Sequence, residues 1–142
     1  MRSKKGFTLV EIMIVVAIIV LLAAIAIPNL LRARLSANEA TSIAAMRTLS
    51  TAAESFRSAQ SPPAYPADLT CLSNTTPPYI DSVLGSGNKS GYNYTYTQGG
   101  SGTSYTVVAA PLTANVTGVR SFFVDSSGVV RVGTTSAGTP IE

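Results

Sequence analysis

The feature that most constrains this chain is an uninterrupted run of sixteen apolar residues from Ile12 to Ile27. With the apolar residues on either side, the hydrophobic stretch covers about 25 positions, and a helix of that length crosses a hydrocarbon layer of about 30 Å. Arg2, Lys4 and Lys5 precede the run. We therefore expect the N-terminus in the cytoplasm and the polar remainder of the chain on the other side of the membrane.

Two interpretations of this segment differ in where the chain is cut. In an ordinary secretory signal peptide, the small residues of Ala24-Ile25-Ala26 would precede a cut before Ile27, and a soluble binding module would be secreted. Glu11 argues against this, because a carboxylate costs roughly 2.5 to 3.5 kcal/mol at the centre of a membrane helix and a disposable leader gains nothing from it. A cut after Gly6 would instead place a new α-amino group on Phe7, one helical turn from Glu11, on the same chain or a neighbour.

The residues around that position form a recognisable pattern. Residues 4–12 read Lys-Lys-Gly-Phe-Thr-Leu-Val-Glu-Ile, and an apolar run with Pro28 and a polar amphipathic segment follow. Over residues 1–58 the chain closely resembles the type IV pilin and type II secretion pseudopilin superfamily. The resemblance implies a leader of residues 1–6, removed by a prepilin peptidase between Gly6 and Phe7, and N-methylation of Phe7. It also implies that Glu11 pairs with the Phe7 amino group of an adjacent subunit in a helical filament.

The resemblance further implies where the protein resides and what it meets. The precursor is expected as a single-pass protein of the inner membrane, and the mature subunit as part of a helical homopolymer. A membrane assembly platform with a cytoplasmic ATPase would build that polymer. The structural subunit of an extracellular type IV pilus is the first expectation, and a periplasmic pseudopilin of a type II secretion system is the alternative. The single Cys71 excludes the C-terminal disulfide loop of many pilins, so the head indicates no subtype.

The N-terminal helix is expected over residues 7–60, because Ser61-Pro62-Pro63 cannot continue it. Residues 7–31 would form the membrane-spanning part and later the filament core, and residues 32–60 an amphipathic part. A helix of that length measures roughly 80 Å, so half of it is expected to protrude from a head of this size and to be covered by lipid or by other copies. Pro28 removes one backbone hydrogen bond and predicts a kink or a locally unwound segment.

The amphipathic part carries one apolar stripe. After Leu35, its members recur at helical spacing, which predicts that this side of the helix packs on a globular head. The four charged residues of the segment fall largely off the stripe, so the other face is expected to stay polar. The stripe consists of Leu35, Ile43, Met46, Leu49, Ala53 and Phe56, and the charged residues are Glu39, Arg47, Glu54 and Arg57.

The head, residues 61–142, is predicted to contain an irregular connection with a short helix near 81–84, and then an antiparallel meander. Short runs of β-forming residues separated by Gly-bearing turns support this assignment, and the fold class is α+β. Alternating Tyr92, Tyr94 and Tyr96 are expected to pack on the helix or on a neighbouring subunit. The predicted strands are 92–97, 104–110, 120–125 and 129–132.

Composition excludes several classes of function. The chain has no His, one Cys and few acids in the head, so neither a catalytic centre nor a metal or cofactor site is expected. The ten Lys and Arg residues form no dense cluster, which excludes a nucleic-acid binding surface. Loss of residues 1–6 would leave seven cations and seven anions. The excess positive charge of the precursor is thus a topology signal, and a neutral mature subunit favours close packing of many copies.

Overall fold

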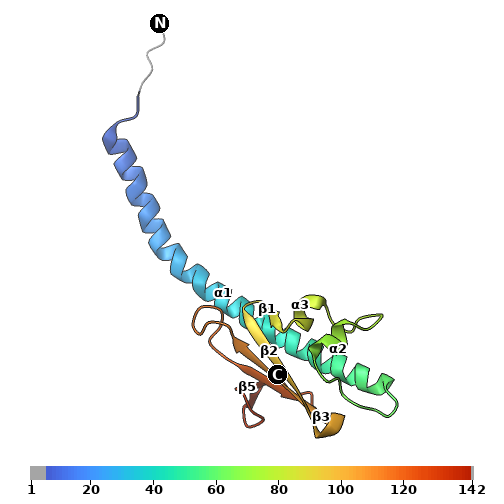
Figure 1. Cartoon of the computed structure of the whole chain (residues 1–142). Coiled ribbons are helices and arrows are strands. Elements are labelled where there is room, and N and C mark those ends of the chain that lie inside the picture. Colours follow the sequence, from blue (N-terminus) through green and yellow to red (C-terminus); the bar gives the residue numbers. More distant parts are fainter. Residues whose placement is uncertain (1–5, 142) are drawn as a thin grey trace. The chain divides into compact units, whose positions relative to one another are not determined.

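A computed structural model describes residues 6–141 of the chain (Figure 1). Arg2, Lys4 and Lys5, which the sequence predicts to belong to a leader, lie outside the described residues. The backbone divides between Ala33 and Arg34 into two compact units, which are described separately below.

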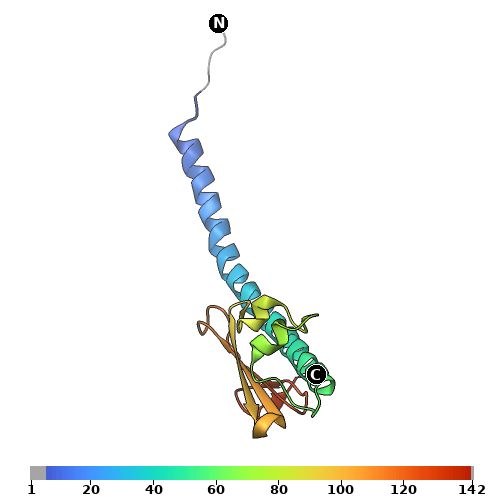
Figure 2. The ribbon, with the colours of Figure 1, turned by 45° about the vertical axis from the view of Figure 1, so that its right-hand side comes forward.

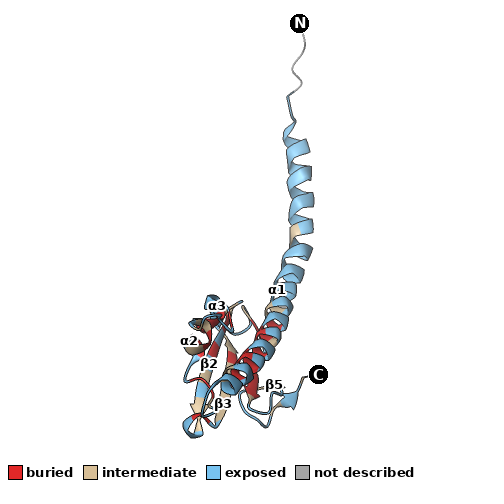
Figure 3. Cartoon of the chain, turned by 90° about the vertical axis from the view of Figure 1, so that its right-hand side faces the viewer, coloured by how far each residue is buried: buried red, intermediate tan, exposed pale blue. Residues whose placement is uncertain are grey.

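The first unit is helical. The long helix α1 (Leu9–Ala59) begins within it and contains Pro28. Helical geometry continues through this proline, so the kink that the sequence predicts there remains a prediction. The large apolar side chains from Leu9 to Leu31 are exposed, and the ribbon of this part of the helix is almost entirely pale blue in Figure 3.

The second unit begins with the remainder of α1, which ends at Ala59 where the sequence predicts an end near Gln60. The Gln60 N–H donates to the Arg57 carbonyl at 3.2 Å and closes the last turn before Ser61-Pro62-Pro63. Two short helices follow, α2 (Leu69–Ser73) and α3 (Ser82–Gly85). The sequence predicts the second of them and misses the first.

The carboxylates of Asp68 and Asp81 start these two short helices. Asp68 accepts a hydrogen bond from the Cys71 N–H at 2.9 Å, and Asp81 accepts one from the Leu84 N–H at 2.6 Å. Hydrogen bonds to these carboxylates lower the pKa of both residues; the largest contribution comes from Thr70 at Asp68 and from Lys89 at Asp81. Both acids therefore have a local structural role.

The rest of the second unit is an antiparallel meander in which each strand pairs with the next along the chain (Figure 2). The fold class predicted from the sequence, α+β with a long N-terminal helix on an antiparallel sheet, is confirmed. All four predicted strands are present; the first and last strands, each of two residues, were not predicted. The strands are β1 (Asn88–Lys89), β2 (Tyr92–Gly99), β3 (Ser104–Pro111), β4 (Phe122–Asp125), β5 (Arg131–Val132) and β6 (Thr139–Pro140).

Turns between the strands carry residues suited to tight backbone geometry. Between β4 and β5, the Gly128 N–H donates to the Asp125 carbonyl at 2.9 Å, and Gly128 has a φ of 75°, which glycine adopts without strain. The Asp125 carboxylate accepts from the Ser127 N–H at 2.9 Å. This segment is the hairpin turn that the sequence predicts. Between β2 and β3, Gly100–Gly102 forms the short 3-10 helix η1.

The core lies between α1 and the sheet. Met46, Leu49 and Ala53 of the predicted stripe are buried, and the aromatic side chains of β2 and β3 cover them. Of the three alternating tyrosines, Tyr92 and Tyr94 are buried and Tyr96 is partly buried, as expected for side chains that pack on the helix. Figure 3 shows the buried residues of α1 on the side that meets the sheet.

One prediction for the helix is wrong. Glu39, which the sequence places with the polar face, is buried at 9% exposure. Arg47, Glu54 and Arg57 are exposed, as expected. Glu39 differs because it has polar partners from the loop before β4, and these compensate for the loss of water.

Candidate processing and assembly site

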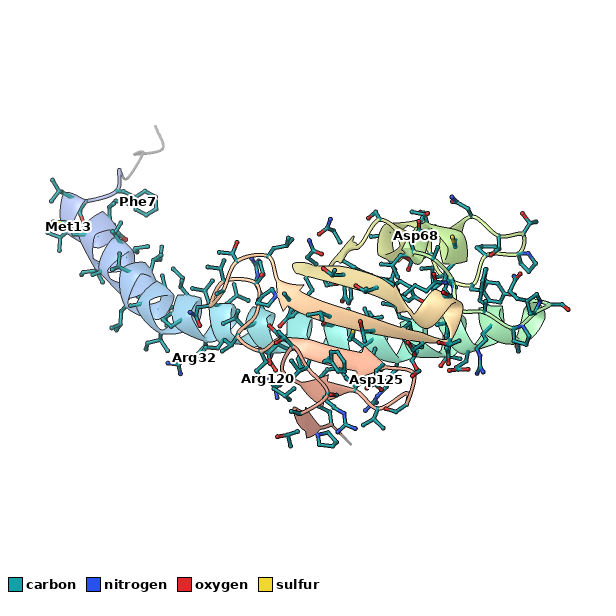
Figure 4. The ribbon with its side chains drawn as sticks, turned by 60° about the horizontal axis from the view of Figure 1, so that its bottom comes forward. Phe7, Met13, Arg32, Asp68, Arg120 and Asp125 are labelled. Carbon is teal, nitrogen blue, oxygen red and sulfur yellow. The ribbon has the colours of Figure 1, made fainter. Side chains whose placement is uncertain are left out.

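The predicted cleavage position precedes the helix. Gly6 and Phe7 are exposed and have no regular secondary structure, and α1 begins at Leu9. A Cβ atom built on Gly6 would meet nothing within 4 Å, so there is open space on that side of the backbone. Figure 4 shows the labelled Phe7 beside the first turn of α1, near Met13. The peptide bond between Gly6 and Phe7 is therefore accessible to a peptidase.

Thr8 and Glu11 together start the helix. The Thr8 hydroxyl accepts from the Glu11 N–H at 3.2 Å, while the Thr8 N–H donates to the Glu11 carboxylate at 3.4 Å. The first helical bond, from the Ile12 N–H to the Thr8 carbonyl, is 3.3 Å. This reciprocal arrangement is a capping box, with Thr8 as the cap and Glu11 three residues later. Thr8 was not predicted as a cap, although Thr-x-x-Glu before an apolar run is the pattern that indicates one.

Glu11 is an acid on an apolar helix surface. Its carboxylate is exposed and receives the long Thr8 hydrogen bond. The ion pairs found in residues 6–141 are Glu54–Arg57, Asp81–Lys89 and Glu39–Arg120, none of which involves Glu11. The carboxylate can therefore accept an additional donor. A cationic amine would compensate for its desolvation best, since charge-assisted hydrogen bonds are the stronger ones.

The helix that carries Glu11 is long and apolar enough to span a bilayer, and the apolar window contributes no buried residue to the fold. A signal sequence near an N-terminus has the same length and composition, so this property by itself does not distinguish the two interpretations. The exposed surface requires a cover of lipid or protein, because water does not solvate a continuous apolar surface of this size favourably.

A second polar site, missed by the sequence analysis, lies in the head. The Glu39 carboxylate accepts from the Val119 N–H at 3.0 Å and the Arg120 N–H at 3.1 Å, and from the Arg120 guanidinium Nε at 2.8 Å. Burial by itself would raise the pKa of Glu39, but these hydrogen bonds and the guanidinium charge outweigh it and lower the pKa. No local pattern could have revealed the pair, because its members are 81 positions apart.

The described residues provide little for catalysis. Within residues 6–141, no group of three His, Cys, Asp or Glu side chains is placed to hold a metal ion. The three aspartates of the head, Asp68, Asp81 and Asp125, serve as two helix caps and in a turn, and Asp81 also pairs with Lys89.

Comparisons with known proteins match part of the chain. The family model described as the prokaryotic N-terminal methylation motif matches residues 1–27. The "Type IV wide pilus major component PilA4" of Thermus thermophilus is 64% identical over 39 residues, which are 28% of this chain and 30% of the relative. The "Type IV major pilin protein PilA" of Myxococcus xanthus is 48% identical over 52 residues, 37% of this chain and 24% of the relative.

A "Fimbrial protein" of Pseudomonas aeruginosa is 49% identical over 55 residues, which are 39% of this chain and 36% of the relative. The chain thus aligns with about a quarter to a third of the length of these relatives. No solved structure matches the chain. Members of the pilin family are structural proteins, not enzymes. The methylation motif and the pilin relatives together show that this chain is similar to type IV pilins over part of its length.

Proposed function

We propose that this protein is the structural subunit of a type IV pilus-class filament, which polymerises through its N-terminal helix. The observation that carries the proposal is the start of α1: an accessible Gly6–Phe7 bond lies directly before a capped apolar helix with Glu11 in its first turn. The named relatives that match part of the chain are major pilins and fimbrial proteins, which supports a pilus over a secretion pseudopilus.

In the proposed pathway, the precursor resides in the inner membrane with residues 7–31 as its single span. A prepilin peptidase cuts between Gly6 and Phe7, and Phe7 is N-methylated. Before the cut, the Phe7 nitrogen belongs to an amide and carries no charge, so it cannot neutralise a carboxylate. After the cut it is a cationic amine, and it pairs with Glu11 of an adjacent subunit as the helices leave the lipid for the filament core.

The energetics favour assembly only after processing. Glu11 without a cationic partner is costly in hydrocarbon, and its pairing in the filament removes that cost. The mature side-chain charge is zero, so stacked copies do not repel each other through a large net charge. A membrane platform with a cytoplasmic ATPase would supply the work of extraction. The mature protein would then be found in surface pili.

The test has two readouts. Mass spectrometry of the mature protein is expected to find an N-methylated Phe7 at the N-terminus, whereas an N-terminus at Ile27 would refute the proposal in favour of a secreted soluble module. Electron microscopy of cells is then expected to show surface filaments of this chain. Loss of an exported enzyme in a deletion strain, with no filament on wild-type cells, would indicate a pseudopilin instead.

The role of Glu11 is tested by Glu11→Ala, which is expected to be cleaved normally but to accumulate in the membrane. Arg47→Ala, which changes an exposed charge on the same helix, is the matched control and is expected to assemble as the wild type does. Normal filament yield from Glu11→Ala would remove the proposed pairing while leaving the processing assignment intact.

A further inference from the structure

The connection between β3 and β4 presents apolar side chains to solvent. In this segment, residues 112–121 and hereafter the β3–β4 loop, the exposed fractions of Leu112, Val116 and Val119 are 57%, 67% and 60%. Residues 111–119 include no charged side chain. Apart from Arg120, which pairs with Glu39, the loop therefore has no charged side chain. Surface loops are ordinarily polar, so three exposed aliphatic residues in such a loop indicate a surface that is covered in the working state.

Hydrogen bonds from α1 hold the C-terminal half of the loop. The Asn38 side-chain amide donates to the Thr117 carbonyl at 2.9 Å. One helix position later, Glu39 accepts from the N–H groups of Val119 and Arg120 at 3.0 and 3.1 Å. Two consecutive helix residues thus bind three residues of the loop, Thr117, Val119 and Arg120. Figure 4 shows the labelled Arg120 where this loop reaches the start of β4.

The loop is also fixed from the sheet and within itself. The Tyr92 hydroxyl donates to the Arg120 carbonyl at 2.8 Å, and Gly118 lies so close to the Tyr92 ring that an added Cβ would overlap it. Within the loop, the Thr117 N–H donates to the Thr113 carbonyl and the Asn115 N–H to the Gly118 carbonyl, both at 2.9 Å. The aliphatic side chains therefore stand on an ordered backbone, and little backbone entropy remains to be lost on binding.

The two charged residues bonded to each other at the C-terminal end of the loop favour a neutral occupant. Glu39 and Arg120 pair with each other, with the Arg120 Nη2 2.8 Å from the carboxylate, so neither charge is free to attract an oppositely charged partner. The other large apolar surface of this chain, Leu9 to Leu31, is similarly free of charge except at Glu11. Mature copies carry no net side-chain charge, so two of them can approach without repulsion.

We propose that the β3–β4 loop is a contact between neighbouring copies of this chain. Its exposed side chains, Leu112, Val116 and Val119, would pack on the apolar helix surface of the next copy, Leu9 to Leu31. This inference rests on the proposed filament. It adds a contact made by the head to the packing of the N-terminal helices. Asn38, Glu39 and Tyr92 are positioning residues for this contact, because their hydrogen bonds hold the loop in place.

A photo-crosslinking amino acid at position 116 tests this directly in filaments sheared from cells. Irradiation is expected to give a covalent dimer of this chain, with the cross-link mapped by mass spectrometry to a peptide of a second copy. The matched control is the same amino acid at Val83, which is 55% exposed on α3, and it is expected to give at most one tenth as much dimer.

Filaments that form with no dimer from position 116, or with a cross-link to lipid or to a different protein, would overturn this contact and leave the filament proposal standing. If the wild-type chain forms no filament, the proposed function fails and this contact fails with it.

A substitution gives a second readout. The double variant Val116→Ser/Val119→Ser removes exposed methyl groups and none of the hydrogen bonds that hold the loop, so the head is expected to keep its unfolding midpoint. Filaments of this variant are expected to dissociate at least about tenfold faster in mild detergent, because the buried apolar area is lost. Val83→Ser is the control with wild-type behaviour. If filaments of the double variant dissociate at the wild-type rate while the head remains folded, the inference is contradicted.

Discussion

Arg120 binds the Glu39 carboxylate through both its backbone and its side chain. Its N–H meets one carboxylate oxygen at 3.1 Å, and Nε meets the other at 2.8 Å. The carboxylate is buried on α1 while the guanidinium is half-exposed, so the pair ties the helix to the start of β4 at the edge of the core. Hydrogen bonds of this kind, with both partners charged, are among the stronger ones in proteins.

The first prediction follows from this pair and concerns pH. The pKa of Glu39 in the folded protein is below its ordinary value near 4.5. The ionised carboxylate therefore stabilises the fold at neutral pH, and this contribution is lost as the pH falls through 4.5 toward the lowered pKa. Urea unfolding of the full chain in detergent, followed by tyrosine circular dichroism, is expected to show a falling free energy of unfolding across that interval.

Glu39→Gln isolates the contribution of this one acid. The variant is expected to lose about 1–3 kcal/mol at pH 7, since a neutral amide accepts the same N–H groups less well, and to have a flatter dependence on pH below 4.5. Asp68, Asp81 and Asp125 also have lowered pKa values, so the free energy of unfolding of the variant is still expected to fall somewhat at acid pH. An unchanged slope in Glu39→Gln would show that Glu39 does not contribute to the acid response.

The second prediction concerns Gly118. A Cβ atom there would lie 2.5 Å from the Cζ atom of the buried Tyr92 ring, which cannot move away because its hydroxyl is bonded to the Arg120 carbonyl. Gly118→Ala is expected to destabilise the head by about 1–3 kcal/mol through overpacking. The measurement is the urea midpoint of the full chain.

A double variant provides the control for this mechanism. Tyr92→Phe removes the hydroxyl, the atom nearest to the added methyl group, so Gly118→Ala is expected to cost less in that background. If Gly118→Ala lowers the free energy of unfolding equally in both backgrounds, the clash with Tyr92 does not cause the loss of stability.

The third prediction compares two adjacent helix positions. Leu49 is fully buried between α1 and the sheet, whereas Thr48 is exposed and its hydroxyl bonds only to the Ala44 carbonyl of its own helix. Leu49→Ala is expected to cost about 2–5 kcal/mol because it leaves a cavity, and Thr48→Ala to change stability by less than about 0.5 kcal/mol. Similar costs at both positions would contradict the packing of this helix face on the sheet.

Local patterns in the sequence predict much of this fold for a physical reason. Met46, Leu49 and Ala53 recur with the helical period, and Tyr92, Tyr94 and Tyr96 with the strand period, because each set faces the same core. The strand of Asn88–Lys89 has too few residues to show any period, and so it was not predicted.

The polar sites differ in how far they can be predicted. Thr8 and Glu11 are three residues apart and form a cap that the sequence pattern contains, so this part of the site was available from the sequence. Glu39 was assigned to solvent because a charged residue on a helix is usually exposed. Its burial depends on Arg120, which the topology of the meander brings to it from the other end of the chain, and helical spacing contains no information on that partner.

The fourth prediction concerns the start of α1 in the unprocessed precursor. Thr8→Ala removes the hydroxyl that accepts from the Glu11 N–H at 3.2 Å, and loss of such a cap costs about 0.5–1 kcal/mol when the bond is long and exposed. In detergent micelles, amide hydrogen exchange at residues 9–12 is therefore expected to become roughly two- to fivefold faster. Thr8→Ser retains a capping hydroxyl and is the matched control, with exchange close to wild type. Equal acceleration in both variants would assign the effect to the lost methyl group and not to the cap, while exchange unaffected by Thr8→Ala would mean that the hydroxyl does not stabilise the first turn.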